Sequence, residues 1–330
     1  GATIRGIASA AGVDPALVMH YFGSKDQLFA ASLELPVNPA DLINVVPGVR
    51  MAIGTYNTNR LVIRGVGSRT PYNTNRIRIY LDDIPLTSGD GISSMEDQDP
   101  LAIGSIEILK GPSSALYGSG LGGVVRLRSP YPAVDGVQGS VIGEAGSFGT
   151  LRYGTLWKFR KNRIAASGGL VRSVSDGFRE NNRYERTSAF ASLRYFRERH
   201  TLSLTLSVTG LFARIPSSLN EEDFTENPTK AAPNWLAVNG FEEYRKALVG
   251  IRGETNLTPR LKNHLVLFTS FADPYESRPF NILDDRSFNL GFREYLEAGW
   301  DHWSLQGGLE LFHEWYGWQN HGRNRVLLQT

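Results

Sequence analysis

The sequence lacks cysteine in all 330 residues. This excludes disulfide frameworks, thiolate metal sites and cysteine nucleophiles. It also lacks any apolar run of about 18 residues, the length that a membrane-spanning helix needs. The formal charge of +2 favours no polyanionic partner. The chain begins at Gly1 without a Met or a secretory signal segment, so we expect that its natural N-terminus lies elsewhere or that it is not exported.

Glycine and aromatic residues are plentiful, with 35 Gly, 13 Tyr, 16 Phe and 6 Trp. This composition suits twisted strands joined by tight turns better than a helical bundle. The hydrophobic pattern changes twice along the chain. Residues 1–43 have a helical period, residues 44–132 show short strands with glycine turns, and residues 137–330 show long alternating strands with polar loops.

The first zone predicts short helices around a turn. One helix follows Thr3 and ends at Gly12, and Asp14 and Pro15 are a cap and first residue for a second helix that stops at Gly23. A capping box then precedes a third helix. This layout is typical of a helix-turn-helix motif.

The segment TIRGIASAAGVDPALVMHYFGSKDQLFAASL resembles the DNA-binding domain of TetR-family repressors. The resemblance implies that the helix from Pro15 enters the major groove and that Thr3, Tyr21 and Lys25 lie at phosphates, which supply affinity rather than sequence choice. The family's first helix and its helical ligand-binding domain have no counterpart. We therefore expect residues 1–43 to be a fused fragment without DNA-binding activity, with nucleic acid as a partner only if the fragment is active.

The second zone predicts a small domain of short mixed strands, near residues 60–65, 76–81, 103–109 and 124–127, with one helical turn at 115–117. Its segments NVVPGVRM, LVIRGVGSR, IRIYLDDIPL and IGSIEILKGPSSALYGSGLGGVVRLRS resemble the plug domain of TonB-dependent outer-membrane receptors. The resemblance implies that residues 44–132 form a plug held inside a barrel.

Four charged residues of this zone are candidates for salt bridges between plug and barrel: Arg64, Glu107, Lys110 and Arg126. Five glycines are expected to permit tight turns with positive φ where the plug packs against the barrel wall: Gly65, Gly111, Gly118, Gly120 and Gly123. The last three also fit G-x-G-x-x-G. A dinucleotide site needs that loop after a strand and before a helix, and here the order is reversed, so we reject that interpretation.

The third zone predicts an antiparallel sheet. Leu202, Leu204, Leu206 and Val208 alternate with Ser203, Thr205, Ser207 and Thr209. Such strands fit a soluble sandwich or a membrane barrel, and alternation alone does not decide. Long strands and interfacial aromatics near Trp315 favour the barrel. So do the predicted connections, which are short turns at one end (160–162, 197–199 and 258–260) and long polar loops at the other (176–183, 215–243 and 273–286).

We count about nine strands in this zone, whereas receptors of the resembled class close with roughly 22 strands. The expected fold is therefore mainly β: a plug and the N-terminal part of an incomplete transmembrane β-barrel (133–330), preceded by a small all-α helix-turn-helix fragment. The chain is interpreted as a chimera truncated at both ends.

No catalytic or metal constellation is recognisable. The six His are scattered, and His313-Glu314 lacks the second His of H-E-x-x-H because position 317 is Gly. We expect no enzyme activity, no cofactor and no metal site.

By resemblance, the function is TonB-energised uptake of a scarce nutrient, such as a ferric siderophore, across the cell outer membrane. The implied partners are outer-membrane lipid, the TonB complex and the ligand. A TonB box is not seen before the plug, so we expect this chain itself not to transport. The alternatives are a TetR-like DNA-binding regulator and a soluble β-sandwich binding protein.

Overall fold

The computed structural model describes residues 43–55, 58–70, 74–88, 91–118 and 120–322. Residues 1–42 of the predicted helix-turn-helix fragment, with Thr3, Tyr21 and Lys25, lie outside the described residues.

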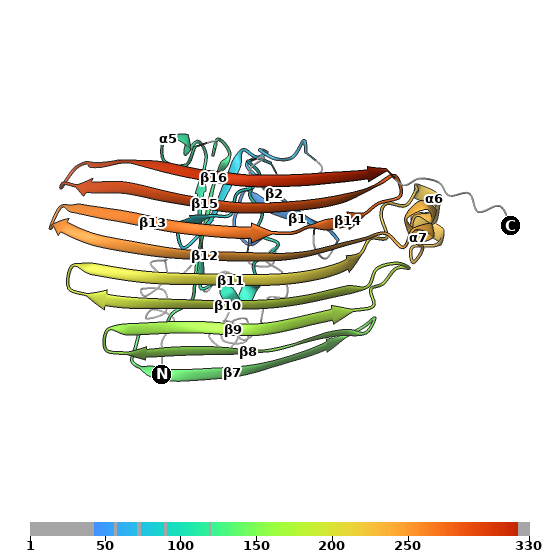
Figure 1. Cartoon of the computed structure of the whole chain (residues 1–330), viewed down its shortest axis with the longest axis horizontal. Coiled ribbons are helices and arrows are strands. Elements are labelled where there is room, and N and C mark those ends of the chain that lie inside the picture. The colour runs from blue at the N-terminus through green and yellow to red at the C-terminus, as the bar shows by residue number, and fades with distance from the viewer. Residues whose placement is uncertain (1–42, 56–57, 71–73, 89–90, 119, 323–330) are drawn as a thin grey trace.

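One large sheet dominates the molecule, and its strands are antiparallel to their neighbours (Figure 1). Apart from the short β14, each strand pairs with the next along the chain, as in an up-and-down barrel. The strands are β7 (Gly136–Gly146), β8 (Thr150–Lys161), β9 (Ile164–Ser175), β10 (Tyr184–Arg197), β11 (His200–Arg214), β12 (Phe241–Thr258), β13 (Leu261–Ala272), β14 (Tyr275–Ser277), β15 (Asn281–Gly299) and β16 (Ser304–Gly322).

The connections differ between the two ends of this sheet. Short turns follow β8, β10 and β12, as the sequence predicted. At the other end the link from β11 to β12 is long and contains α6 (Glu221–Glu226) and α7 (Pro233–Ala237). Asn220 caps α6 by accepting the backbone N–H of Asp223. The sequence predicted only polar loop here, because helices this short carry too little periodicity to detect.

A second correction concerns residues 273–286, which were predicted to be a long loop. The structure places β14 and the start of β15 there, so the connection at this end is shorter than expected. β14 pairs with both β12 and β15 and extends the sheet beyond the end of β13. It is the strand that the sequence count of about nine missed.

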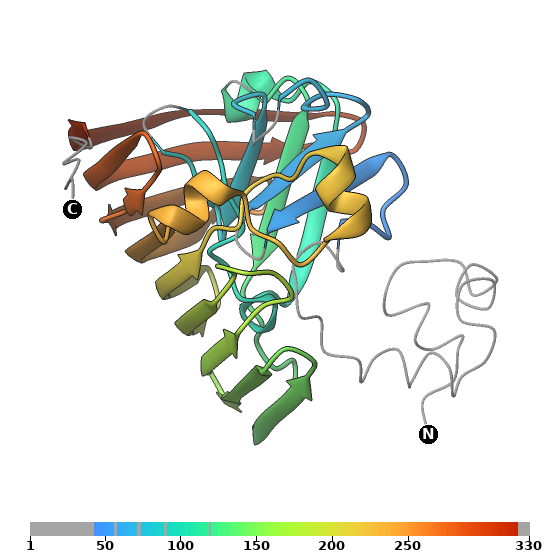
Figure 2. The same cartoon turned by 90° about the vertical axis from the view of Figure 1, so that its right-hand side faces the viewer.

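The plug zone contains two small sheets. β1 (Val49–Thr55) pairs with β2 (Thr58–Ile63), and the other sheet has the order β4-β3-β6-β5. Its strands are β3 (Ile77–Leu81), β4 (Ile84–Pro85), β5 (Ser105–Lys110) and β6 (Gly123–Arg128), with the 3-10 helix η1 (Pro100–Ala102) and the helix α5 (Ser114–Tyr117) between strands. Figure 2 shows these elements on the concave side of the large sheet.

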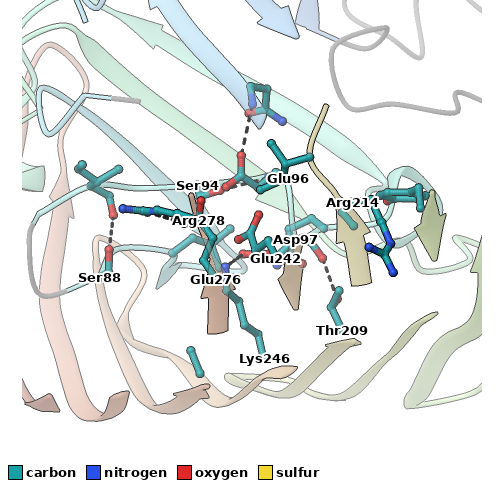
Figure 3. Close-up of a pocket in the computed structure, with 18 of the residues that line it drawn as sticks. Ser88, Ser94, Glu96, Asp97, Thr209, Arg214, Glu242, Lys246, Glu276 and Arg278 are labelled. Carbon is teal, nitrogen blue, oxygen red and sulfur yellow. Dashed lines mark hydrogen bonds and ion pairs between the residues drawn. The ribbon is translucent and has the colours of Figure 1, made fainter. Parts of the chain in front are cut away.

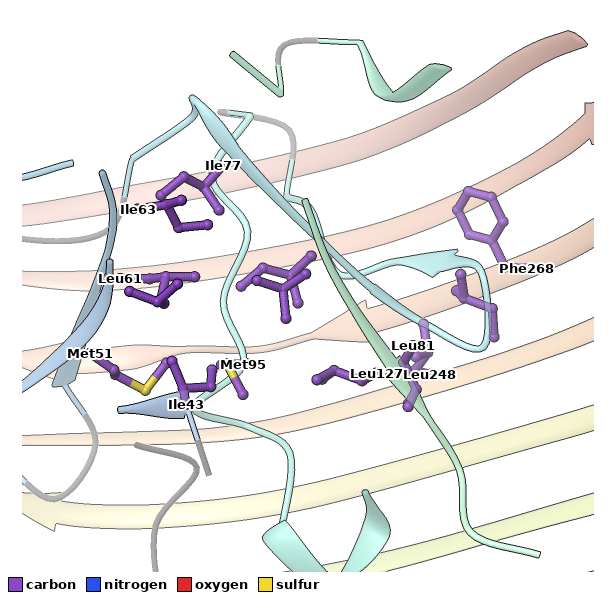
Figure 4. Close-up of a cluster of buried hydrophobic side chains, with 14 of the residues drawn as sticks. Ile43, Met51, Leu61, Ile63, Ile77, Leu81, Met95, Leu127, Leu248 and Phe268 are labelled. Atoms are coloured by element: carbon purple, nitrogen blue, oxygen red, sulfur yellow. The ribbon is translucent and has the colours of Figure 1, made fainter. Parts of the chain in front are cut away.

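The main hydrophobic core is shared between the plug and the large sheet (Figure 4). Leu248 of β12 and Phe268 of β13 are buried against plug residues such as Leu81. Ile43, which the sequence assigned to the helix-turn-helix fragment, is fully buried in the same cluster. At Gly250 of β12, an added Cβ would lie 2.1 Å from Ile84 Cδ1, so the plug approaches the sheet where the sheet has no side chain.

The two faces of β11 have opposite environments. Leu202 and Leu204 are 53% and 41% exposed, whereas Ser203 and Thr205 are 4% and 3% exposed. The hydroxyl face therefore lies toward the plug, and the aliphatic face points outward. Because no second sheet among the described residues covers that outer face, a sandwich is the wrong architecture.

Candidate functional site: the plug junction and its cavity

The turn between β3 and β4 presents two carboxylates at the tip of a plug hairpin. Leu81 pairs with Ile84, so Asp82 and Asp83 form a two-residue loop. Both have positive φ, 50° and 69°. Positive φ at both loop positions is the geometry of a type I′ hairpin turn, which Asp tolerates better than most residues.

Asp82 is buried and joins the plug to two strands of the large sheet. Its carboxylate accepts hydrogen bonds from the Thr205 hydroxyl of β11 at 2.8 Å and from the Arg194 guanidinium of β10 at 3.3 Å. It also accepts the backbone N–H of Ser129 at 3.0 Å. This residue therefore ties the hairpin tip both to the sheet and to the end of β6.

Asp83 faces three arginines. Its carboxylate lies 3.2 Å from Arg126 and 2.8 Å from Arg128, both on β6, and 2.8 Å from Arg252 on β12. Burial raises the pKa of Asp83, but the charges of Arg252 and Arg128 outweigh it and hold the pKa below its usual value. The carboxylate is therefore ionised and compensates cations from both the plug and the sheet.

A second acidic segment, residues 96–99, meets the sheet farther along the strands. Asp97 accepts from Lys246 at 2.9 Å and from the Tyr244 hydroxyl at 2.5 Å. Asp99 pairs with Arg152 of β8 at 3.0 Å. Burial raises the pKa of Asp97, yet Lys246 reverses the shift and the pKa is lowered.

Glu96 behaves in the opposite way. Burial, followed by the charge of Asp97, raises the pKa of Glu96 to about 7. The carboxylate of Glu96 accepts a hydrogen bond from the backbone N–H of Asn59 at 3.4 Å. The backbone carbonyl of Glu96 accepts one from the guanidinium of Arg186 on β10 at 2.8 Å. Near neutral pH this side chain therefore exists in both protonation states.

A cavity of about 1140 Å³ lies between this acidic segment and the long connections of the sheet (Figure 3). Plug residues 85–88, 94 and 96–98 line one side, and residues 178, 179, 182, 213–215 and 217–219 line another. Eight charged side chains line it, four of each sign: Arg179, Arg214, Lys246 and Arg278, with Glu96, Asp97, Glu242 and Glu276. The cavity opens at the end of the sheet that carries α6 and α7.

The four charged residues that the sequence predicted as plug–barrel contacts make polar contacts inside the plug. Glu107 and Arg126 face each other across β5 and β6 and pair at 2.8 Å. Lys110 donates to the Pro47 carbonyl at 3.0 Å, and Arg64 is exposed in the turn after β2, where its backbone N–H donates to Gly48. The charges that cross the boundary are instead those of Asp82, Asp83, Asp97 and Asp99.

The predicted glycine turns differ among themselves. Gly65, Gly111, Gly118 and Gly123 have positive φ, whereas Gly120 does not. Gly123 has the tightest surroundings, because a Cβ there would lie 2.4 Å from the Leu109 carbonyl oxygen. That contact is within the plug, between β5 and β6, and not at the barrel wall.

Asp82 and Asp83 were not among the charged residues predicted from the sequence to join the plug to the barrel. A two-residue acidic loop flanked by alternating strands is a hairpin signal that could have placed them at the tip of a hairpin, although it does not predict the burial of that tip against the sheet. Their arginine partners on β10 and β12 carry no such signal.

Among the described residues no helix is long and apolar enough to cross a membrane.

Comparisons with known proteins agree with this architecture. Residues 32–125 match the TonB-dependent Receptor Plug Domain, and residues 1–32 match the tetR family of bacterial regulatory proteins. The chain is 34% identical over 93 residues to a ferrioxamine receptor of Yersinia enterocolitica, which covers 27% of this chain and 12% of that protein. It is 25% identical over 170 residues to the vitamin B12 transporter BtuB of Vibrio vulnificus, which covers 51% of this chain and 26% of that protein.

Among solved structures, the ferric yersiniabactin uptake receptor FyuA from Yersinia pestis superimposes with a TM-score of 0.68 and 17% identity, over 85% of this chain and 47% of that one. The chain thus spans less than half the length of each of these three proteins. The chain carries the plug domain of the TonB-dependent receptor family, beside a sheet with the fold of the barrel of these receptors.

Proposed function

We propose that this chain supplies the plug and one wall of the barrel of an outer-membrane receptor for a scarce nutrient, such as a ferric siderophore. The observation that carries the proposal is the cavity, which is lined by the plug, by the inner face of the sheet and by the long connections of the sheet. In outer-membrane barrels the long connections face the outside of the cell. A ligand arriving from outside would therefore meet this cavity before it meets the plug core.

The outer face of the sheet supports the membrane location. Its exposed side chains are aliphatic and aromatic along several neighbouring strands, for example Leu204, Leu267 and Leu309. A continuous apolar face of this kind is costly in water and suits contact with hydrocarbon. We therefore propose that the long strands β7–β13, β15 and β16 cross the outer membrane, and that the short β14 does not.

The domain division follows from the same elements. The sequence predicted a plug at 44–132 and barrel strands at 133–330; we propose the same boundary at 132/133 and an earlier start for the plug. The two family matches meet at residue 32, and Ile43 packs in the plug core, which favours a junction before Ile43 rather than after it.

Energy coupling through the TonB complex would require the plug to move relative to the barrel. The ion pairs of Asp83 and Asp97 with Arg252 and Lys246 oppose such movement. We propose that these contacts break during uptake, and that three of the charges predicted from the sequence, Glu107, Lys110 and Arg126, keep the plug itself intact. A contact of the fourth, Arg64, with the barrel stays a prediction.

Cell fractionation followed by ligand binding tests the proposal. The chain should sediment with outer membrane, and those membranes should retain a ⁵⁵Fe-labelled ferric chelate above the level of membranes without the chain. A monodisperse protein in detergent-free buffer that binds no ferric chelate would contradict the proposal.

A second candidate, a DNA-binding regulator, rests on the match of residues 1–32 to the tetR family. It predicts salt-dependent DNA affinity, because phosphate contacts release counterions. The matched control is the change of both Tyr21 and Lys25 to Ala, which should abolish that affinity. Binding that survives the change would not come from this motif.

A further inference from the structure

The charged groups of the cavity nearly cancel one another. Its lining has four cationic and four acidic side chains, whose formal sum is zero when all four carboxyls are ionised. Burial raises the pKa of Glu96 to about 7, so near neutral pH the lining carries less than one net positive charge. A site built for a strongly anionic ligand would instead concentrate one sign of charge. The lining therefore offers little net attraction to a polyanion.

Two of the cations are already paired with carboxylates that belong to the cavity. Lys246 lies 2.9 Å from Asp97, and Arg278 pairs with Glu276 (Figure 3). An anionic ligand that bound either cation would have to displace its carboxylate and leave that carboxylate unpaired, which costs free energy in a partly buried site.

The other two cations hold the walls together. The Arg179 guanidinium donates to the carbonyls of Ser217 at 2.6 Å and Lys230 at 2.8 Å, which joins the loop after β9 to the long connection after β11. Arg214 donates to the Asn239 carbonyl at 3.1 Å. Their N–H groups serve the fold of the wall, so a ligand anion would compete with these carbonyl oxygens.

The lining also carries aromatic side chains that are exposed toward solvent. Phe224 of α6 is 70% exposed, Phe280 between β14 and β15 is 66% exposed, and Phe178 in the loop after β9 is 46% exposed. These residues come from three different connections at one end of the sheet. Exposed aromatics around a cavity are typical of sites that bury apolar ligand surface.

We infer that this cavity takes a ligand with no net charge and with apolar surface, rather than a polyanionic chelate. The inference rests on the proposed function and narrows its ligand class. The volume of about 1140 Å³ suits a bulky ligand, because pockets for drug-sized ligands measure roughly 300–1,000 Å³.

Two ferric complexes of similar size but different charge test the inference. Three hydroxamates neutralise Fe³⁺, whereas three catecholates leave a net charge of about −3. The chain, folded in detergent micelles, is titrated with each complex by isothermal calorimetry. We expect the neutral trihydroxamate complex to bind at least about tenfold more tightly than the tricatecholate complex.

The variant Glu276→Gln removes the carboxylate that neutralises Arg278. It should raise the affinity for the tricatecholate complex by about tenfold and change that for the trihydroxamate complex by less than about twofold. The control is Glu198→Gln, an exposed residue in the turn between β10 and β11 at the opposite end of the strands, which should change neither affinity.

Tighter binding of the tricatecholate complex to the unchanged chain would overturn the inference and leave the proposed function in place. Binding of neither complex would overturn both. Equal responses of the two complexes to Glu276→Gln would overturn the charge argument.

Discussion

Replacing Asp83 with Asn tests whether the hairpin tip holds the plug against the sheet by charge. Asn has the same shape as Asp and also tolerates positive φ, so the turn geometry is kept. What disappears is the negative charge that faces Arg126, Arg128 and Arg252. Three cations would then remain close together without that carboxylate.

The expected loss follows from burial. The Asp83 side chain is 5% exposed, and its arginine partners are between 13% and 22% exposed. Breaking a buried ion pair costs about 3–5 kcal/mol. Arg126 keeps Glu107 as a partner and the arginines retain some contact with water, so we expect about 3 kcal/mol, at the lower end of that range.

The assay is urea unfolding of the chain in detergent micelles, at pH 7 and at successively lower pH. Because the pKa of Asp83 is lower in the folded state, its stabilisation is present above the unfolded pKa of about 3.9 and is lost as the pH falls toward the folded pKa. The difference in the free energy of unfolding between the two proteins should therefore shrink below about pH 4.

The control is Asp135→Asn. The side chain of Asp135 is 57% exposed and lies 3.8 Å from Arg160, so we expect a change below about 0.5 kcal/mol. A cost for Asp83→Asn as small as this control, or one independent of pH, would refute the reasoning.

Three further changes have defined outcomes. Gly250→Val should displace Ile84 from its site on β12 and cost about 1–3 kcal/mol in the same unfolding assay; a neutral effect would mean that the plug does not pack there. Burial raises the pKa of Glu96 to about 7, so its protonated form favours the folded state at low pH and this contribution is lost as the pH rises from about 4.3 toward 7. Glu96→Gln should therefore increase the free energy of unfolding, relative to the unchanged protein, more at pH 8 than at pH 5. If the free energies of unfolding of both proteins change with pH in the same way, the pKa of Glu96 is not raised. If β11 crosses the bilayer, Leu204→Arg should make the free energy of folding into lipid vesicles less favourable by about 2–4 kcal/mol. The control is Leu257→Arg, near a short turn, which should cost at most about 1 kcal/mol. Equal costs for the two changes would argue against a bilayer at Leu204.

The expectation that this chain does not itself transport stays a prediction. So do the DNA phosphate contacts of the N-terminal fragment, which lie outside the described residues.

Local pattern was sufficient for much of the fold. The alternation of Leu204 with Ser203 and Thr205 predicted a two-faced strand, because successive side chains in a strand point to opposite sides. The short turns after β8, β10 and β12 were also predictable, since turn residues act over a few positions. The plug pair of Glu107 and Arg126 needed one further step, the antiparallel register that sets them opposite each other.

Only the tertiary structure decided which charges meet across the boundary between plug and sheet. Lys246 and Asp97 are 149 positions apart, and no local period connects them. The same holds for Asp83 and Arg252, which meet because the sheet curves around the plug and brings β12 to the hairpin tip. The sequence by itself determined which residues could form strands and which side of each strand is apolar. The curvature and register of the sheet determined which polar side chains the plug meets. Curvature and register depend on packing over the whole chain, so no local pattern predicts them.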